Sequence, residues 1–200
     1  MTEFFLNKKK VKAKDDETIW TVAKREGIVL PHLCFADKPG YRADGNCRAC
    51  MVSIEGERVL AASCIRKPTE GMKVVTNDER STKSRKMVLE LLVTDQPDRE
   101  TSHDPDSHFW NVASSVDVAK SRFDKREKTI VPCEDASHVA MSVNLDACIH
   151  CNLCVRACRE VQVNDVIGMG NRGHHSKVIF DFNDPMGDSS CVSCGECVQA

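Results

Sequence analysis

The sequence predicts an α+β protein built from two small domains and a polar connector. Three observations lead to this fold class: strand and helix patterns alternate over residues 1–95, apolar periodicity fades over residues 96–140, and cysteines crowd residues 141–200. A chain of 200 residues allows one or two domains. Its 41% hydrophobic content can fill an ordinary core, whereas its 5% aromatic content indicates that the cores are small.

The chain begins with a hairpin pattern that is followed by a helix pattern. EFFL and KKVKA are strand-like and are separated by a turn at Asn7 and Lys8. In ETIWTVAKREG, apolar residues recur at helical spacing, with Asp15 or Asp16 before the segment and Gly27 after it. These signals predict a β-hairpin and a short amphipathic helix.

Further strands and a longer helix complete the predicted domain at residues 1–95. CMVSIEGERVLAASC predicts a second hairpin that turns at Glu55 and Gly56, MKVVT predicts a further strand, and ERSTKSRKMVLELLV predicts a helix. Residues 96–140 are rich in Asp, Ser, Pro and charge, and the run KSRFDKREK is typical of a solvated surface. We therefore interpret residues 96–140 as a connector.

Composition argues against several classes of partner. The net charge of -2 provides no basic field that would attract nucleic acid or an anionic membrane surface. No run of about 18 apolar residues is present, and the first residues have no apolar segment typical of a secretory signal. We expect a cytoplasmic protein whose partners are neither nucleic acid nor membrane.

The twelve cysteines are the strongest functional signal in the sequence. Disulfides rarely persist in the cytosol, and they usually join distant points of a chain. Here eleven of the twelve fall into three tight sets, and Cys133 stands alone in IVPCEDASH, where we expect a free thiol. Metal ligation accounts for this grouping better than disulfides do.

One cysteine set lies within the predicted first domain. A long glycine-bearing loop supplies three thiols, and the fourth returns at the end of the second hairpin: Cys34, Cys47, Cys50 and Cys64. A 2Fe–2S cluster needs four thiolates and backbone N–H groups turned toward its sulfides. Gly40 and Gly45 can supply the positive φ that such a loop requires. A four-thiolate zinc site is the alternative interpretation.

The other two sets lie in residues 141–200 and share one pattern, which indicates an internal duplication. C-x2-C-x2-C-x3-C is the run of bacterial 4Fe–4S ferredoxins, in which three thiolates bind one cluster and the fourth reaches the other cluster. It is present as Cys148, Cys151, Cys154 and Cys158, and begins again as Cys191, Cys194 and Cys197. Zinc rarely takes three thiolates from so short an arc.

This crossed pattern assigns Cys158 to the second cluster, with Cys191, Cys194 and Cys197. The first cluster, on Cys148, Cys151 and Cys154, then has no fourth cysteine within the sequence. We expect either that the chain is a fragment cut inside its last motif, or that the site keeps a 3Fe–4S cluster or borrows a ligand. The fragment is favoured because the missing thiol would follow Ala200 directly.

The segments around these cysteines carry a family resemblance. NLDACIHCNLCVRACREVQVNDVIGM, followed by VIFDFNDPMGDSSCVSCGECVQA, resembles the N-terminal iron–sulfur region of the α subunit of soluble NAD-dependent molybdenum or tungsten formate dehydrogenases. DQPDRETSHDPDSHFW points the same way. The first cysteine loop also resembles the N-terminal ferredoxin domain of the large iron–sulfur subunits of NADH:quinone oxidoreductases and iron-only hydrogenases.

The resemblance implies a fold and a domain plan. It implies a β-grasp 2Fe–2S ferredoxin domain at residues 1–95 and a bacterial-type two-cluster 4Fe–4S ferredoxin domain at residues 141–200, truncated at its C-terminal end. Relatives usually carry a histidine and three cysteines in the connector, where they bind an additional cluster. Residues 95–132 contain His103 and His108 and no cysteine, so we expect that cluster to be absent in its usual form.

The resemblance also implies a function. It implies an electron relay that passes single electrons between a formate site and a flavin- and NAD-binding partner subunit of a hetero-oligomer. The molybdenum or tungsten bis-pterin centre would lie only in the C-terminal part outside this chain. No catalytic motif is found in the sequence, so we expect no catalytic residue here. The alternatives are the equivalent segment of an NADH:quinone oxidoreductase or hydrogenase, and a zinc-stabilised structural assembly module.

Overall fold

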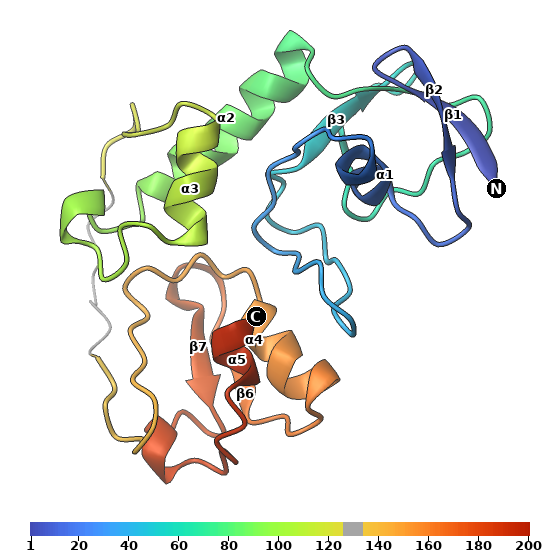
Figure 1. Ribbon diagram of the computed structural model, residues 1–200. Helices are drawn as coiled ribbons and strands as arrows, with labels where there is room; N and C mark the ends of the chain where they lie inside the picture. The colour runs from blue at the N-terminus through green and yellow to red at the C-terminus, as the bar shows by residue number, and fades with distance from the viewer. Residues whose placement is uncertain (126–133) are drawn as a thin grey trace. The chain divides into compact units, whose positions relative to one another are not determined.

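The computed structural model describes residues 1–125 and 134–200, which form two compact units (Figure 1). The first unit comprises Met1–Phe35, Ala43–Thr94 and Asp104–Lys125. The second comprises Ala36–Arg42, Asp95–His103 and Arg126–Ala200. Residues 96–140, which we expected to form a connector, are thus divided between the units. Cys133 lies outside the described residues.

The first unit contains a five-stranded mixed sheet. Its strands are β1 (Thr2–Leu6), β2 (Lys9–Ala13), β3 (Met51–Ile54), β4 (Ala61–Ala62) and β5 (Lys73–Val75), in the order β2-β1-β5-β3-β4. β1 and β5 are parallel, and the other neighbours are antiparallel. Both predicted hairpins and the predicted MKVVT strand are therefore confirmed.

The first hairpin turns where the sequence predicts. Leu6 pairs with Lys9, and the two residues between them, Asn7 and Lys8, have φ values of 48° and 71°. Positive φ at both turn positions matches the right-handed twist of the strands. Asn7 also exchanges two hydrogen bonds of 2.8 Å with Thr76, which fixes this turn to the segment after β5.

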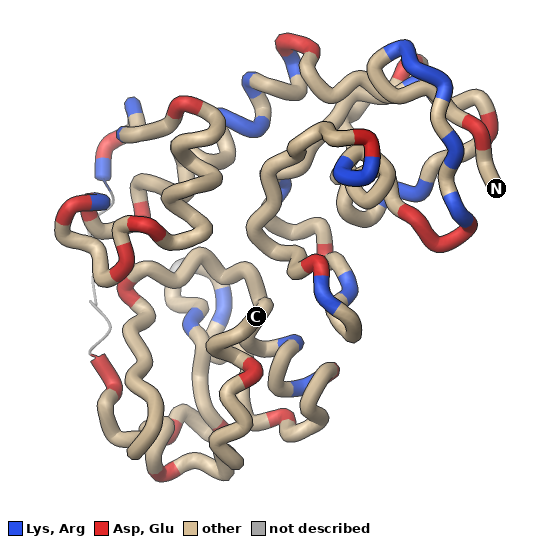
Figure 2. Tube along the Cα trace, viewed as in Figure 1, with Lys and Arg blue, Asp and Glu red and all other residues tan. Residues whose placement is uncertain are grey.

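One carboxylate of this hairpin pairs with two of its lysines. Lys10 and Lys12 both pair with Glu3 on the neighbouring strand, at 2.5 Å and 3.3 Å. Figure 2 shows basic residues along this hairpin and both signs of charge elsewhere on the chain. Exposed pairs of this kind contribute little to stability.

Helix α1 (Ile19–Arg25) covers the core of the sheet, with Ile19, Trp20, Val22 and Ala23 buried. Its N-cap is Thr18, whose hydroxyl accepts from the Thr21 N–H at 3.2 Å. Asp15 and Asp16 precede the helix, as expected, but the helix begins three residues after Asp16 and its N-cap is Thr18.

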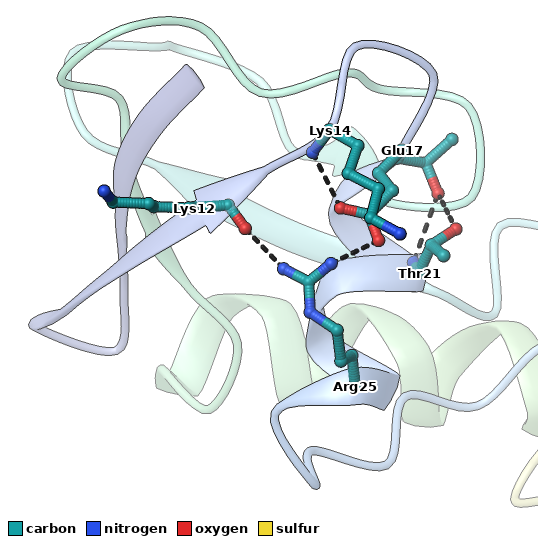
Figure 3. A network of polar contacts seen from close by, with 6 residues as sticks. Lys12, Lys14, Glu17, Thr21 and Arg25 are labelled. Atoms are coloured by element: carbon teal, nitrogen blue, oxygen red, sulfur yellow. Dashed lines mark hydrogen bonds and ion pairs between the residues drawn. The ribbon is translucent and has the colours of Figure 1, made fainter. Parts of the chain in front are cut away.

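Arg25 ties the end of this helix to β2. Its guanidinium donates to the Lys12 carbonyl oxygen and pairs with the Glu17 carboxylate (Figure 3). Glu17 in turn accepts a 2.8 Å bond from the Lys14 N–H. The segment between β2 and α1 is therefore held by a network that joins strand, turn and helix.

The second hairpin is shorter than its sequence suggests. Gly56 has a φ of 86°, and the Glu57 N–H bonds to the Ile54 carbonyl at 3.0 Å, so the chain turns at the predicted place. Only Met51 and Val52 pair with β4, whereas Ser53 and Ile54 pair with β5 on the other edge of β3.

Two helices follow the sheet in the first unit. Helix α2 (Glu79–Val93) has the predicted bounds and is capped by Asp78, whose carboxylate accepts from the Ser81 N–H at 3.3 Å. Helix α3 (His108–Ser115) lies in the part of the chain that we expected to be a connector. Its N-cap is Ser107, and Phe109, Trp110, Val112 and Ala113 are buried. The apolar spacing within HFWNVASS is typical of a helix, although the polar composition of the surrounding residues obscures it.

The second unit has a smaller framework. Strands β6 (Ile167–Gly170) and β7 (Lys177–Phe180) form an antiparallel pair. Helix α4 (Leu153–Arg156) continues into a π-helical turn at Ala157–Val161, and helix α5 (Glu196–Gln199) ends the chain. Short 3-10 turns lie at Arg99–Thr101, Gly173–His175 and Met186–Asp188.

The core of this unit is small and includes cysteines. Its buried side chains come from α4, the π-helical turn, both strands and Met186, and Cys148, Cys154, Cys191 and Cys197 pack against them. Across the described parts of the chain, no helix combines the length and the apolar character needed to cross a membrane.

Candidate metal centres

The first cysteine set converges through the strand register. Cys50 directly precedes β3 and Cys64 follows β4, so the Met51–Ala62 pair brings them to the same end of the hairpin. The Cys50 carbonyl accepts from the Ser63 N–H at 3.3 Å and from the Ser63 hydroxyl at 2.8 Å. A ladder pair and two further bonds therefore set the spacing of these two thiols.

The remaining two thiols of this set lie in the loop between α1 and β3. Cys34 is buried and Cys47 is half-buried. Gly45, with a φ of 65°, lies between them in the sequence, and a Cβ at this position would lie 2.8 Å from Ile65 Cδ1. The positive φ predicted for Gly40 and Gly45 is confirmed, because Gly40 has a φ of 87°. The loop can follow this path because these positions lack a side chain.

The four thiols interact with one another. Cys34 accepts hydrogen bonds from the thiols of Cys47 and Cys64 and from the N–H groups of Cys47 and Asn46, and these outweigh its burial and lower its pKa to about 2. Hydrogen bonding to Cys64 likewise lowers the pKa of Cys50 to about 6. The thiols that donate, Cys47 and Cys64, have raised pKa values. This environment favours thiolate character at two sulfurs.

This donor set fits a cluster. Four thiols meet in one place, and backbone N–H groups point at Cys34, which are the features that a 2Fe–2S cluster requires. Among the described residues, no three Cys, His, Asp or Glu side chains are placed to share a single metal ion. A 2Fe–2S cluster does not need such a triplet, because four thiolates are divided between its two irons.

In the second unit, Cys158 lies with the last three cysteines. One pocket is lined by Cys158, Cys191, Cys194 and Cys197, together with apolar side chains and Asn164. Cys158 therefore lies where the crossed ligation pattern requires it. Burial, and then the neighbouring thiols of Cys191, Cys194 and Cys158, raise the pKa of Cys197. Thiolates crowded in this way repel one another unless a cationic group shares them.

Donor groups reach the sulfurs of this pocket. The Val166 N–H lies 3.3 Å from Cys158 Sγ and is buried, and Asn164 Nδ2 lies 3.9 Å from Cys194 Sγ. The Ser193 N–H donates to Cys191 Sγ at 3.5 Å. Hydrogen bonds to sulfur help to set the reduction potential of an iron–sulfur cluster. The pocket thus also fits a cluster, and sequence reasoning missed Asn164 because it stands outside the cysteine motif.

Cys148, Cys151 and Cys154 form the third set. Burial, and then the neighbouring thiols of Cys151 and Cys148, raise the pKa of Cys154 to about 12. Cys148 and Cys154 also pack against the core of the second unit. Within the described residues, the thiols of Cys151 and Cys148 thus lie close enough to Cys154 to affect its pKa.

The backbone of the two C-terminal cysteine loops repeats. His150 and Asn152 have φ values of 54° and 62°, and the equivalent positions in the other loop, Ser193 and Gly195, have values of 58° and 75°. In both loops, positive φ occurs at the residue before the second cysteine and at the residue after it. Because positive φ is uncommon for residues other than glycine, this match supports the predicted internal duplication.

A tyrosine and an arginine lie near these cysteines in the second unit. The Tyr41 hydroxyl donates to Glu196 Oε1 at 2.8 Å, next in sequence to Cys197. Burial, and then this bond, raise the pKa of Tyr41 to about 12. Arg156, between Cys154 and Cys158, is 3% exposed. Neither residue belongs to a motif that would have marked it in the sequence.

Two histidines, His108 and His138, are hydrogen-bonded to segments near the cysteines. His108 Nε2 lies 2.8 Å from the carbonyl oxygen of His32, two residues before Cys34, and the two rings are 5.2 Å apart. His138 Nε2 lies 2.9 Å from Ser193 Oγ, within the last cysteine loop. Both histidines therefore contact segments that carry cysteines, although neither contact is with a sulfur.

Comparison with known families agrees with this geometry. Residues 1–79 match a family described as a 2Fe-2S iron-sulfur cluster binding domain. Residues 147–200 match a family described as a 4Fe-4S dicluster domain. The first match covers the sheet and the first cysteine set, and the second covers the two C-terminal sets.

Curated relatives are redox proteins. The chain is 29% identical to NADP-reducing hydrogenase subunit HndD of Solidesulfovibrio fructosivorans, over 99% of this chain and 34% of that protein. It is 26% identical to a subunit of the NADH-quinone oxidoreductase of Rhizobium meliloti, over 100% of this chain and 23% of that protein. A protein of Staphylococcus haemolyticus, provisionally named as a formate dehydrogenase, is 27% identical over 87% of this chain and 17% of its own length.

A solved structure shares the fold. A chain in the crystal structure of NAD+-reducing NiFe-hydrogenase in the H2-reduced state matches with a TM-score of 0.82 and 26% identity, over 95% of this chain and 80% of that one. The chain spans about a third or less of the length of the curated relatives described above. Together the matches support an iron–sulfur electron-relay segment of an oxidoreductase group.

Proposed function

We propose that this chain, an iron–sulfur segment of that oxidoreductase group, is the electron relay of a formate dehydrogenase α subunit. It would pass single electrons between a formate-oxidising molybdenum or tungsten pterin site outside this chain and a flavin- and NAD-binding partner subunit. The observation that carries the relay is the convergence of thiols, with N–H donors directed at their sulfurs, in both units.

Each cysteine set has a proposed role. A 2Fe–2S cluster would be held by Cys34, Cys47, Cys50 and Cys64, on a sheet that we propose to be a β-grasp fold. One 4Fe–4S cluster would be held by Cys158, Cys191, Cys194 and Cys197, and another would take Cys148, Cys151 and Cys154 as three of its ligands. When bound, such clusters accept and release one electron at a time. The protein orients the thiolates, buries them and directs N–H groups at their sulfurs.

The connector favours formate dehydrogenase over the other relatives. Residues 95–132 contain no cysteine, whereas the relatives with an additional cluster need ligands there. His108 is engaged by the His32 carbonyl rather than by a cysteine. We also propose a cytoplasmic hetero-oligomer, because free thiols at this density suit a reducing compartment.

Spectroscopy of the loaded chain tests the relay. We expect iron and acid-labile sulfide in similar amounts, and separate EPR signals of 2Fe–2S and 4Fe–4S type as the anaerobic protein is reduced in steps. A colourless protein with stoichiometric zinc and no labile sulfide would support the structural assembly module and overturn the relay.

The choice among relatives needs the complete protein to which this segment belongs. Formate is expected to reduce the clusters of the purified complex, and hydrogen gas or NADH without formate serves as the comparison. Reduction by hydrogen but not by formate would assign the chain to a hydrogenase, and the formate dehydrogenase proposal would fail while the relay remained.

A further inference from the structure

Arg85 is a buried cation close to the first cysteine set. It lies on α2, where Ser81, Arg85 and Leu89 recur every four residues along one buried face. Only 8% of Arg85 is exposed, whereas its neighbour Lys86 is exposed. Arginine is rarely buried unless its charge is paired and its N–H groups are hydrogen-bonded. The contacts of Arg85 therefore indicate what it does.

The guanidinium of Arg85 holds the backbone that follows Cys50. Its Nη1 donates to the Met51 carbonyl oxygen at 2.9 Å, and this bond is buried. The preceding carbonyl, that of Cys50, accepts from the Ser63 hydroxyl at 2.8 Å. Two consecutive carbonyl groups are thus held from two different elements. Cys50 itself is 0% exposed, so its thiol is shielded from solvent.

The charges that face Arg85 come from Asp78 and Cys50. Burial lowers the pKa of Arg85, and attraction to the Asp78 carboxylate and then to the Cys50 thiolate opposes that effect. Asp78 also accepts a 2.9 Å bond from the Ser53 hydroxyl on β3. An arginine side chain stays charged in proteins. A fixed positive charge therefore lies within electrostatic reach of Cys50.

We propose that Arg85 is a positioning residue of the first cysteine set, and that its buried charge raises the reduction potential of the cluster bound there. Reduction adds one negative charge to a cluster, and net charge is one of the factors that set its potential. A positive charge acts more strongly in a poorly solvated site than at the surface, where salt screens it. This inference rests on the proposed 2Fe–2S site and adds a residue outside the cysteine motif.

Substitutions that separate charge from shape test the proposal. Arg85→Met removes the charge and keeps an unbranched chain, Arg85→Gln keeps a donor for the Met51 carbonyl, and Arg85→Lys keeps the charge. In the full chain loaded anaerobically, EPR-monitored titration should show a more negative 2Fe–2S potential for the Met and Gln variants. The Lys variant should remain close to the wild type. Iron content and far-UV circular dichroism establish that each variant is folded and loaded.

Lys86 offers a matched control on the same helix. Lys86→Met removes the same charge from an exposed position. Figure 2 shows basic residues along this helix. Its shift in potential should be several times smaller than that of Arg85→Met. Equal shifts for the two variants, or a wild-type potential in Arg85→Gln, would overturn the proposal.

Asp78→Asn provides a second test of the buried charge if the Arg85 variants do not fold or do not bind a cluster. Asparagine is as good an N-cap as aspartate, so α2 keeps its start while a negative charge near Arg85 is lost. The 2Fe–2S potential should then become more positive, and an unchanged potential would contradict the role of the buried charge. If the wild-type chain itself forms no 2Fe–2S signal, the proposed function fails. If it does and only the potentials stay fixed, this inference alone fails.

Discussion

Cys158 is close in sequence to one cysteine motif and close in space to the other. It follows Cys154 by four residues, yet it lines the pocket of Cys191, Cys194 and Cys197. The change occurs where α4 passes into the π-helical turn that contains Cys158. A π turn widens the helix and rotates the following side chains, and the Val166 N–H then meets the sulfur.

Loss of Cys158 should damage the cluster of the other motif. In Cys158→Ala, we expect the 4Fe–4S signal associated with Cys191, Cys194 and Cys197 to be lost or converted to a 3Fe–4S signal, because one thiolate of that pocket is missing. The cluster on Cys148, Cys151 and Cys154 should keep its signal. EPR of the stepwise reduced protein, together with iron analysis, measures both.

Cys154→Ala is the matched control for this experiment. It removes a thiol four residues away, on the same helical segment, and should produce the opposite pattern of loss. If both variants remove the same signal, each motif binds its own cluster and the crossed ligation is wrong.

At the scale of elements, the start of helix α2 is held by the contacts of its N-cap residue, Asp78. The Asp78 carboxylate bonds to Ser81 at the start of the helix and to Ser53 on β3. Burial alone would raise the pKa of Asp78, but the bonds from Ser81 and Ser53 outweigh it and lower the pKa. One carboxylate thus caps the helix and joins it to the sheet beside the first cysteine set.

Replacement of Asp78 by alanine should destabilise the first unit. Loss of an N-cap costs about 1 kcal/mol, and the Ser53 hydroxyl loses its partner as well. Because the folded-state pKa is lowered, the contribution of Asp78 is complete above the ordinary pKa of about 3.9. It is lost as the pH falls through the folded-state value. Urea unfolding of the iron-free chain at neutral and acidic pH measures both effects.

Asp78→Asn serves as the comparison for this cap. It should retain most of the stability at neutral pH and lose less than the wild type on acidification, since it has no carboxylate to protonate. Identical pH profiles for the wild type and Asp78→Asn would show that Asp78 does not contribute in this way.

At the scale of the whole chain, the two units differ in the size of their sheets and cores. The first has a five-stranded sheet and a core that extends well beyond its cysteines. The second has a two-stranded sheet, and four cysteines pack against its small core. Small cores often need a metal or another crosslink, and metal binding then contributes directly to folding.

Removal of iron should therefore loosen the second unit more than the first. Hydrogen exchange of the iron-free chain should show retained protection in β1, β3 and β5 and reduced protection in β6, β7 and the segments around residues 148–158. The loaded chain serves as the reference. Equal loss in both units would show that the sheet also depends on its cluster, contrary to this prediction.

Local patterns in the sequence determined much of this protein. Strand alternation and turn residues specified both hairpins, and helical spacing specified α2 with its bounds. The cysteine spacing predicted three sets with iron–sulfur chemistry, and the family comparisons agree with 2Fe–2S and 4Fe–4S domains. These features could be predicted because each depends on residues close together in the chain.

The tertiary structure decided the features that depend on residues far apart in the chain. The N-cap of α1 is Thr18 and not one of the aspartates that precede the segment, and α3 lies in a stretch whose overall polarity concealed its apolar face. Arg85 is recognisable as a positioning residue only from the packing of α2 on β3, which brings its guanidinium to the carbonyl of the residue after Cys50. Spacing along the chain predicts which residues can bind iron, whereas packing determines which charges and N–H groups surround them.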